Sequence, residues 1–288
     1  MLERPPVRKA VIPAAGRGTR CLPLSKSIPK ELLPVFDRPG IELICQEACE
    51  SGVESFVLVS SPRKPELSAH FQTDAELEAQ ISNKPDLLAA IQRSAAYQVE
   101  TCFQDEPKGL GHAVACAAEL VGNEPFAVML PDDLVLGAQP ALAALIQAYE
   151  ASGKSVVLLK EVPLEDTPRY GIVSGTVQDD GSVLIDDLVE KPAPEEAPSR
   201  LAVVGRYVFG PGMFERLASV QAGALGEIQL TDAMASLARE EGMIGLMIEG
   251  KRLDAGDTLG LFRAALHYAA ESPQLRKMII EFAGTLES

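Results

Sequence analysis

The sequence is poor in histidine and in basic residues, and it contains no long apolar run. Its 3 histidines are scattered, which disfavours a zinc site or a histidine-based catalytic triad. Lysine and arginine number 26 against 41 acidic residues, a net charge of -15, so neither nucleic acid nor an anionic membrane is an expected partner. No apolar stretch approaches the roughly 18 residues that a membrane span needs. The first nine residues also lack the apolar core of a signal peptide.

Cysteine is scarce as well, and its spacing excludes the common metal and redox motifs. The 5 cysteines are odd in number and form no pair separated by two residues. This pattern is typical of reduced thiols, so we expect a cytoplasmic protein. Cys45 and Cys49 lie four residues apart and can share one helix face, where packing is a better interpretation than metal binding.

Against this acidic background, the stretch from Lys9 to Pro34 is locally basic. It begins with a short apolar run that predicts a buried strand and continues into a loop containing Gly16 and Gly18. Four basic residues follow between Gly16 and Glu31. A glycine-rich loop brings backbone N–H groups close to a ligand, and arginine and lysine neutralise phosphate charge. The stretch therefore predicts a phosphate-binding loop.

The order of expected elements predicts an α/β fold. In the first half, apolar strands alternate with helices. We expect the strand 53–59, a helix that begins at Ser61-Pro62, the helices 85–96 and 111–120, and the strand 126–130. This order indicates a mostly parallel sheet covered by helices on both faces. In the second half, 172–177 and 183–189 are expected to form a β-hairpin and 201–209 a strand, and two helices are expected after residue 257.

The loop does not fit the common phosphate-binding fingerprints. A dinucleotide site has a third glycine where this chain has Cys21, and Asp37 lies in a turn instead of at the end of the second strand. A Walker A loop needs Gly-Lys-Ser or Gly-Lys-Thr, which is absent. An NAD-dependent oxidoreductase is therefore disfavoured. A loop for a reacting triphosphate is the interpretation that remains.

The chain resembles the sugar nucleotidyltransferases, with the first two blocks at Ala14–Arg20 and Pro29–Pro34. The resemblance covers nearly the whole chain and is closest to the bacterial UTP–glucose-1-phosphate uridylyltransferases. The further blocks, in order, are 109–113, 130–133, 170–173, 189–192, 204–207, 226–232 and 254–256.

The resemblance implies a Rossmann-like fold with a mixed, mostly parallel central sheet and helices on both faces. It also implies a small β-rich lobe on the sugar side and C-terminal helices. Residues 7–270 would form a single domain, with 7–165 mainly binding the nucleotide and 166–256 mainly the sugar. Residues 257–288 would form the C-terminal helical segment.

The implied reaction transfers a uridylyl group from UTP to glucose 1-phosphate and gives UDP-glucose and pyrophosphate. A phosphate oxygen of the sugar attacks the α-phosphorus in line, so no general base is needed. Mg²⁺ is the implied cofactor, and a homo-oligomer, either a dimer or a tetramer, is the implied assembly. Two alternatives stay open: a relative that uses dTTP or another sugar 1-phosphate, and a catalytically silent nucleotide-sugar sensor.

The resemblance also implies the site residues. The catalytic set is Arg20, Lys30, Asp132 and Lys191. The nucleotide-binding set is Ala14, Ala15, Gly16, Gly18, Thr19, Glu31, Gln104 and Gly109. Gly171, Glu190 and Lys191 would bind the sugar phosphate. Asp132 would hold the metal at the carboxyl end of the strand 126–130, with Asp254 as the second metal contact.

Five further residues keep open assignments. Lys26 is a weaker candidate for the leaving pyrophosphate, and Asp133 is expected to point away from the metal. Arg206 and Asp232 carry family support without a defined role, and structural ion pairs explain them equally well. His112 could touch the nucleotide or serve the structure.

Overall fold

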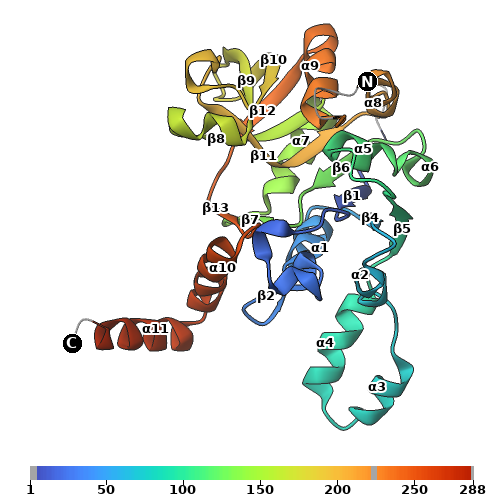
Figure 1. Ribbon diagram of the computed structural model, residues 1–288, viewed down its shortest axis with the longest axis vertical. Helices are drawn as coiled ribbons and strands as arrows, with labels where there is room; N and C mark the ends of the chain where they lie inside the picture. The colour runs from blue at the N-terminus through green and yellow to red at the C-terminus, as the bar shows by residue number, and fades with distance from the viewer. Residues whose placement is uncertain (1–4, 222–225, 287–288) are drawn as a thin grey trace.

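The computed structural model describes residues 5–221 and 226–286, which build one nine-stranded sheet with helices on both faces (Figure 1). The strand order is β5-β4-β1-β6-β11-β8-β12-β10-β9. The strands are β1 (Lys9–Pro13), β4 (Ser55–Ser60), β5 (Val99–Phe103), β6 (Phe126–Met129), β8 (Val156–Glu161), β9 (Gly171–Val177), β10 (Val183–Glu190), β11 (Leu201–Phe209) and β12 (Met243–Met247). The expected α/β fold is confirmed.

The two halves of the sheet differ in strand direction. Strands β5, β4, β1 and β6 pair in parallel, as the alternation of strands and helices predicted. Strand β11 runs antiparallel to both β6 and β8, and the hairpin β9–β10 pairs antiparallel to β12. The β-rich part expected on the sugar side is therefore the far end of the same sheet.

Helices cover the sheet and extend beyond it (Figure 1). They are α1 (Gly40–Glu50), α2 (Pro65–Ala69), α3 (Ala75–Gln80), α4 (Pro85–Ala95), α5 (Leu110–Ala115), α6 (Ala118–Val121), α7 (Ala141–Ser152), α8 (Met213–Ser219), α9 (Leu230–Glu241), α10 (Thr258–Glu271) and α11 (Pro273–Thr285). Figure 1 shows α3–α4 and α10–α11 projecting as two arms. Within the described residues, no helix has the length and apolarity needed to cross a bilayer.

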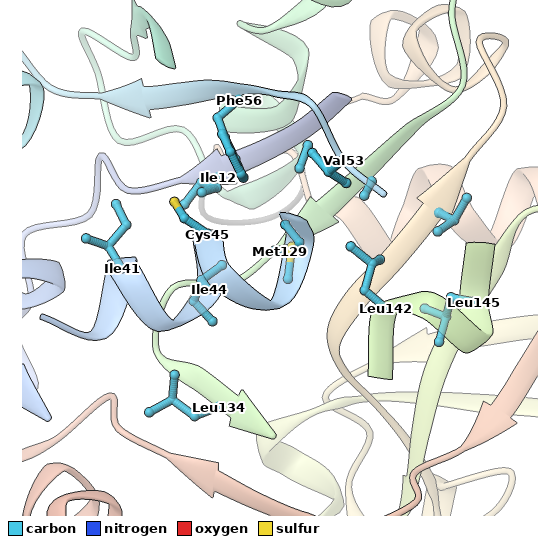
Figure 2. Close-up of a cluster of buried hydrophobic side chains, with 14 of the residues drawn as sticks. Ile12, Ile41, Ile44, Cys45, Val53, Phe56, Met129, Leu134, Leu142 and Leu145 are labelled. Atoms are coloured by element: carbon cyan, nitrogen blue, oxygen red, sulfur yellow. The ribbon is translucent and has the colours of Figure 1, made fainter. Parts of the chain in front are cut away.

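Successive side chains along each strand point to opposite faces of the sheet. The strands therefore contribute to two apolar cores, one on each face. On β1, Ile12 packs with α1, α7 and part of α10, whereas Val11 packs with α5, α8 and α9. Figure 2 shows the first core, where Cys45 of α1 lies next to Ile12. The expected packing role of Cys45 is confirmed, while Cys49, one helical turn later, is exposed.

Two local expectations about helices were wrong. Ser61-Pro62 does not begin a helix, because α2 starts at Pro65 with Lys64 as its N-cap. The Lys64 side chain turns inward and donates to the carbonyl oxygen of Ala14. The single helix expected over 111–120 is broken into α5 and α6.

Two short strands were not predicted from the sequence. Strand β7 (Asp133–Leu136) and strand β13 (Lys251–Asp254) form a separate antiparallel pair. A second small pair joins β2 (Pro34–Val35) and β3 (Arg38–Pro39). The β7–β13 register places Asp254 opposite Asp133, so a segment near the end of the chain returns to the carboxyl end of β6.

An ion pair with a fully buried arginine ties the centre of the sheet to α1. The Arg206 side chain has no exposed surface, and its Nε and Nη2 donate to the two carboxylate oxygens of Glu47 at 3.0 and 2.6 Å. Glu47 also accepts the backbone N–H of Leu142 at the start of α7, at 3.2 Å. Arg206 therefore has a structural role, which was one of its two open interpretations.

Removing one charge of this pair should destabilise the fold strongly. We expect Glu47→Gln to lower the free energy of unfolding by about 3 kcal/mol, because the Arg206 guanidinium stays buried without a counter-charge. Urea denaturation followed by circular dichroism measures the change. The matched control is Glu54→Gln, which removes the partner of Arg8 in an exposed pair and should cost less than about 1 kcal/mol. Equal losses in the two variants would refute the structural role.

Candidate active site

The glycine-rich loop follows β1 and continues the strand pairing for one more residue. The backbone N–H of Ala14 donates to the carbonyl oxygen of Val59 at 2.8 Å. Gly18 then adopts a φ of 65°, and a Cβ at this position would lie 3.2 Å from the Cβ atoms of Ser25 and Lys30. Only glycine combines this backbone conformation with so close an approach. A Cβ on Gly16 would meet nothing within 4 Å, so that residue borders open space.

Cys21, which breaks the dinucleotide fingerprint, joins the loop to the end of the chain. Its thiol is buried and donates to the carbonyl oxygen of Gly256 at 3.4 Å. Burial raises the pKa of this thiol even though Lys30 and Arg20 act in the opposite direction. Cys21 is therefore a packed, protonated side chain that holds the loop against the 254–256 segment.

The loop supplies two cations to Asp132, the residue that follows β6. Lys30 Nζ lies 2.6 Å from Asp132 Oδ2, and Arg20 Nη2 lies 3.5 Å from the same oxygen. Burial alone would raise the pKa of the Asp132 carboxyl, but Lys30 and Arg20 outweigh it and hold that pKa below its usual value. Burial acts to lower the pKa of Lys30, but the charges of Asp132 and Glu31 and the hydrogen bond to Asp132 together outweigh it and raise that pKa. The Asp132 carboxylate and the Lys30 ammonium group therefore both carry charge at neutral pH.

Asp254 approaches Asp132 through the β7–β13 pairing. The backbone N–H of Ala255 donates to the Asp132 carbonyl oxygen at 2.7 Å, which fixes the two segments side by side. A Cβ built on Gly256 would lie against Arg20 Nη2, 2.8 Å from Asp132 Oδ2 and 2.9 Å from Asp254 Oδ1, so the Arg20 guanidinium borders the same space as the two carboxylates. Both carboxylates thus border one small space that only a glycine leaves open.

Asp132 and Asp254 are the two carboxylates that could hold a divalent cation at this site. Within the described ranges, no group of three or more histidine, cysteine or acidic side chains could enclose a metal by itself. Mg²⁺ is usually bound through one or two carboxylates plus phosphate oxygens and waters. Asp132 and Asp254 match that pattern, whereas a structural zinc or calcium site would need more protein ligands.

Two cavities meet at Asp132. The loop-side cavity, about 300 Å³, is bordered by Ala15, Gly16, Lys30, Glu31, Gln104 and Gly109. The hairpin-side cavity, about 490 Å³, is bordered by Arg20, Gly171, Glu190, Lys191, Thr231 and Asp254. Leu110, Leu130 and Asp132 border both. Residues from the first and second halves of the chain thus face each other across one carboxylate.

The hairpin-side cavity presents a carboxylate and a cation at the end of β10. Glu190 accepts a hydrogen bond from Thr231 Oγ1 at 2.6 Å, and Lys191 Nζ lies 3.3 Å from Glu190 Oε1. Lys191 has a φ of 47°, an uncommon conformation for a residue with a side chain, while its N–H donates to the Tyr170 carbonyl oxygen. A Cβ on Gly171 would lie 3.0 Å from Thr231 Oγ1, so glycine keeps this wall open.

In the loop-side cavity, Gln104 is buried and its amide group has a defined direction. Its Nε2 donates to the Gly109 carbonyl oxygen at 3.1 Å and lies 2.9 Å from His112 Nδ1. Both contacts use the amide nitrogen, which leaves the Gln104 carbonyl oxygen to accept from a ligand. Gly109 has a φ of 96°, and a Cβ there would lie 2.6 Å from the Ile228 carbonyl oxygen. His112 acts here by positioning Gln104.

Glu31 and Lys64 form a buried pair beneath the loop. Lys64 Nζ lies 3.1 and 3.0 Å from the two Glu31 carboxylate oxygens and 2.7 Å from the Ala14 carbonyl oxygen. Burial raises the pKa of Glu31 even though Lys64 and Lys30 act to lower it. Lys64 was missed by the sequence reasoning. Its position just after the carboxyl end of a parallel strand was the signal that could have found it.

Arg252 was also missed, and it supports the hairpin-side cavity. Its guanidinium binds both carboxylate oxygens of Asp133 at 2.7 and 2.9 Å, and it lies 5.4 Å from the centre of the Tyr170 ring. Asp133 also accepts the N–H of Gly205 at 3.0 Å. Asp133 therefore points away from Asp132, as expected, and is fully engaged in the structure.

Most of the predicted site residues border the two cavities, and three do not. Ala14 is buried in the core, and its carbonyl oxygen is held by Lys64. Gly18 packs its backbone against the Lys30 side chain and does not border either cavity. Thr19 faces a third cavity on the outer side of the loop. Asp232 lies near Glu190, and its pKa is raised by burial and by that neighbouring carboxylate.

The model of the nucleotidyl transferase family matches residues 9–271. A UTP–glucose-1-phosphate uridylyltransferase of Bacillus subtilis is 43% identical over 97% of this chain and 95% of its own length. A second one from the same organism is 42% identical, over 96% of each chain.

Solved structures show the same similarity. A UDP-glucose pyrophosphorylase complexed with UDP-glucose superposes with a TM-score of 0.85 and 38% identity, covering 92% of this chain and 100% of that one. A UTP-bound pyrophosphorylase from Acinetobacter baumannii superposes with a TM-score of 0.87 and 39% identity, covering 96% and 98%.

The balance of charges at Asp132 can be tested by titration. In Lys30→Ala, burial is no longer opposed by the nearest cation, so we expect the Asp132 carboxyl to titrate above its ordinary pKa of 3.8 instead of below it. Carbon-13 NMR of the labelled carboxyl groups measures this pKa. Lys26→Ala is the control, because Lys26 makes no contact with Asp132, and its Asp132 pKa should match that of the unmodified protein. An Asp132 pKa that stays low in Lys30→Ala would contradict the assignment.

Proposed function

The chain belongs to the nucleotidyl transferase family, and from this premise we propose that it is a UTP–glucose-1-phosphate uridylyltransferase. It would transfer the uridylyl group of UTP to glucose 1-phosphate and release pyrophosphate. The observation that carries the proposal is the meeting of two cavities at Asp132, with Lys30 and Arg20 beside it. The loop-side cavity is bordered by the glycine-rich loop and the Gln104 amide. The hairpin-side cavity is bordered by the Glu190 carboxylate, which can accept from hydroxyl groups, and by the Lys191 ammonium group.

The loop-side cavity suits uridine and its phosphates. The Gln104 carbonyl oxygen can accept the ring N–H of uracil, and the carbonyl and backbone around Gly109 border the same edge. Ala15 and Gly16 have little or no side chain and allow a base and phosphate to lie close to the backbone. The α-phosphate would then sit at Asp132, where both cavities open.

The hairpin-side cavity suits a sugar 1-phosphate. Glu190, already oriented by Thr231, can accept sugar hydroxyl groups, and Gly171 leaves room for the ring. Lys191 has an exposed ammonium group that can bind the sugar phosphate. A phosphate placed there faces Asp132 and the α-phosphate from the side opposite the glycine-rich loop.

Catalysis would come from positioning and charge. The sugar phosphate is already ionised at neutral pH, so its oxygen attacks the α-phosphorus without a general base. The bond to the bridging oxygen breaks on the far side, and the electron pair leaves with pyrophosphate. Lys30, which borders the loop-side cavity, lies where the growing negative charge of that leaving group can be neutralised, and Arg20 adds positive charge on the hairpin side of the same carboxylate.

Magnesium is the proposed cofactor, with Asp132 and Asp254 as its protein ligands. The support is the space between their oxygens at Gly256 and the retention of charge on Asp132. When bound, Mg²⁺ would neutralise and orient the substrate phosphates. Lys30 now occupies Asp132 Oδ2 at 2.6 Å and would turn toward a phosphate in the substrate complex.

A homo-oligomer, either a dimer or a tetramer, is part of the proposal. Its support is the C-terminal arm, where α11 has no buried residue and exposes large apolar side chains including Met278, Ile280 and Phe282. Light scattering would compare the mass in solution with the 30.7 kDa of one chain. We also propose a cytoplasmic location, supported by the odd number of cysteines.

Pyrophosphate release tests the reaction directly. Each nucleoside triphosphate is paired with several sugar 1-phosphates, with Mg²⁺ or with excess EDTA. We expect the highest kcat/KM for UTP with glucose 1-phosphate, and loss of turnover in EDTA that Mg²⁺ restores. A preference for dTTP would assign the chain to thymidylyl transfer instead. No release from any pair would leave nucleotide-sugar sensing as the function.

A further inference from the structure

A third cavity lies on the outer side of the glycine-rich loop and is basic. This basic cavity, about 400 Å³, is bordered by Arg17, Lys26, Arg63 and Lys64, with Asp105 as its acidic neighbour. The cations come from two separate segments, the loop region after β1 and the turn after β4. Hydroxyl groups of Thr19, Ser25 and Ser61 border it too.

Three of these cations have no internal counter-charge. In the part of the chain that the structure describes, the side chains of Arg17, Lys26 and Arg63 form neither an ion pair nor a hydrogen bond, whereas Lys64 is neutralised by Glu31. The protein has a surplus of acidic groups, with a net charge of -15, and most of the other lysines and arginines in the described residues form ion pairs. Three unpaired cations around one cavity thus create a local positive potential that favours a polyanion.

The basic cavity is continuous with the loop-side cavity. Ala15, Gln104 and Pro107 border both, and the Glu31–Lys64 pair stands between them, with Glu31 facing one and Lys64 facing the other. Along the loop, Arg20 faces the hairpin-side cavity while Arg17 faces the basic cavity. The loop therefore separates the side where a sugar phosphate would enter from the side where the basic cavity lies.

We propose that the basic cavity is a binding site for free inorganic pyrophosphate, held by Arg17 and Arg63 with Lys26. The inference rests on the proposed function, because in-line displacement sends the leaving group away from the hairpin-side cavity. Pyrophosphate carries several negative charges over two phosphorus centres, which matches cations arriving from two segments. The product then moves from Arg20 and Lys30 to a second position outside the loop before it reaches solvent, and it enters by the same route in the reverse reaction.

Calorimetric titration of inorganic pyrophosphate into the full chain, without other substrates, tests this site. We expect Arg17→Ala/Arg63→Ala to raise the Kd for pyrophosphate by about tenfold, since two charge-assisted contacts are lost at an exposed site. The Kd for UTP should change by less than about twofold. Arg17→Lys/Arg63→Lys keeps both charges and should recover most of the affinity, which separates loss of charge from loss of folding.

A matched control removes the same charge elsewhere. Arg93 and Arg263 are exposed and form no ion pair within the described residues, so Arg93→Ala/Arg263→Ala should leave the pyrophosphate Kd unchanged. No measurable binding of pyrophosphate to the unmodified protein would overturn the inference. An unchanged Kd in Arg17→Ala/Arg63→Ala would also overturn it. A UTP Kd that rises as much as the pyrophosphate Kd would show that the cavity holds the triphosphate instead.

The titration needs no catalysis, so it separates the two proposals. Tight pyrophosphate binding that depends on Arg17 and Arg63, in a chain that transfers no uridylyl group, would refute the proposed function and support the anion site. Uridylyl transfer at full rate with pyrophosphate affinity unaffected by the two substitutions would refute the anion site alone.

Discussion

The site depends on one half-buried carboxylate, Asp132, and the two cations that hold it ionised. Burial works against a charge at this position, and Lys30 and Arg20 reverse that preference. Asp254 borders the same space, so two cations stand beside two carboxylates there. When a phosphate and a metal arrive, the same groups can exchange partners without a change in their protonation.

The fold places this cluster where its parallel and antiparallel parts meet. Asp132 follows β6, the last strand of the parallel part, and β6 is bonded to β11, the first antiparallel strand. Directly beneath, Asp133 is bound by Arg252 and by the Gly205 amide of β11, and Arg206 is bound by Glu47 of α1. Asp133 and Glu47 are thus fully paired within the protein. Asp132, in contrast, borders both cavities.

The sequence predicted the parts whose signals are local. The loop after β1, the strand Leu201–Phe209 and the two C-terminal helices were all expected from periodicity, glycine and proline. The pairing of β7 with β13 was not predicted, because each strand has four residues and the partner lies more than a hundred residues away. The same long-range contact brings Asp254 to Asp132. Only the family resemblance, and no pattern within the chain, had suggested that the two act together.

Lys64 and Arg252 illustrate a second limit of sequence reasoning. Each is a long cation whose role depends on a buried partner from another segment, Glu31 or Asp133, and nothing in its neighbours in the chain indicates that partner. The basic cavity was anticipated only in part, since the excess charge of the loop was visible but Arg63, on a different segment, was not connected with it.

The central claim is a single in-line displacement, with the sugar phosphate attacking from the hairpin side and pyrophosphate leaving on the loop side. The stereochemical course at the α-phosphorus tests it most directly. UTP carrying sulfur at the α-phosphate in one defined configuration is converted with glucose 1-phosphate, and phosphorus-31 NMR reads the configuration of the UDP-glucose analogue. The account predicts inversion, because attack and departure lie on opposite sides of one phosphorus. Retention would mean two successive displacements through a covalent intermediate and would contradict it.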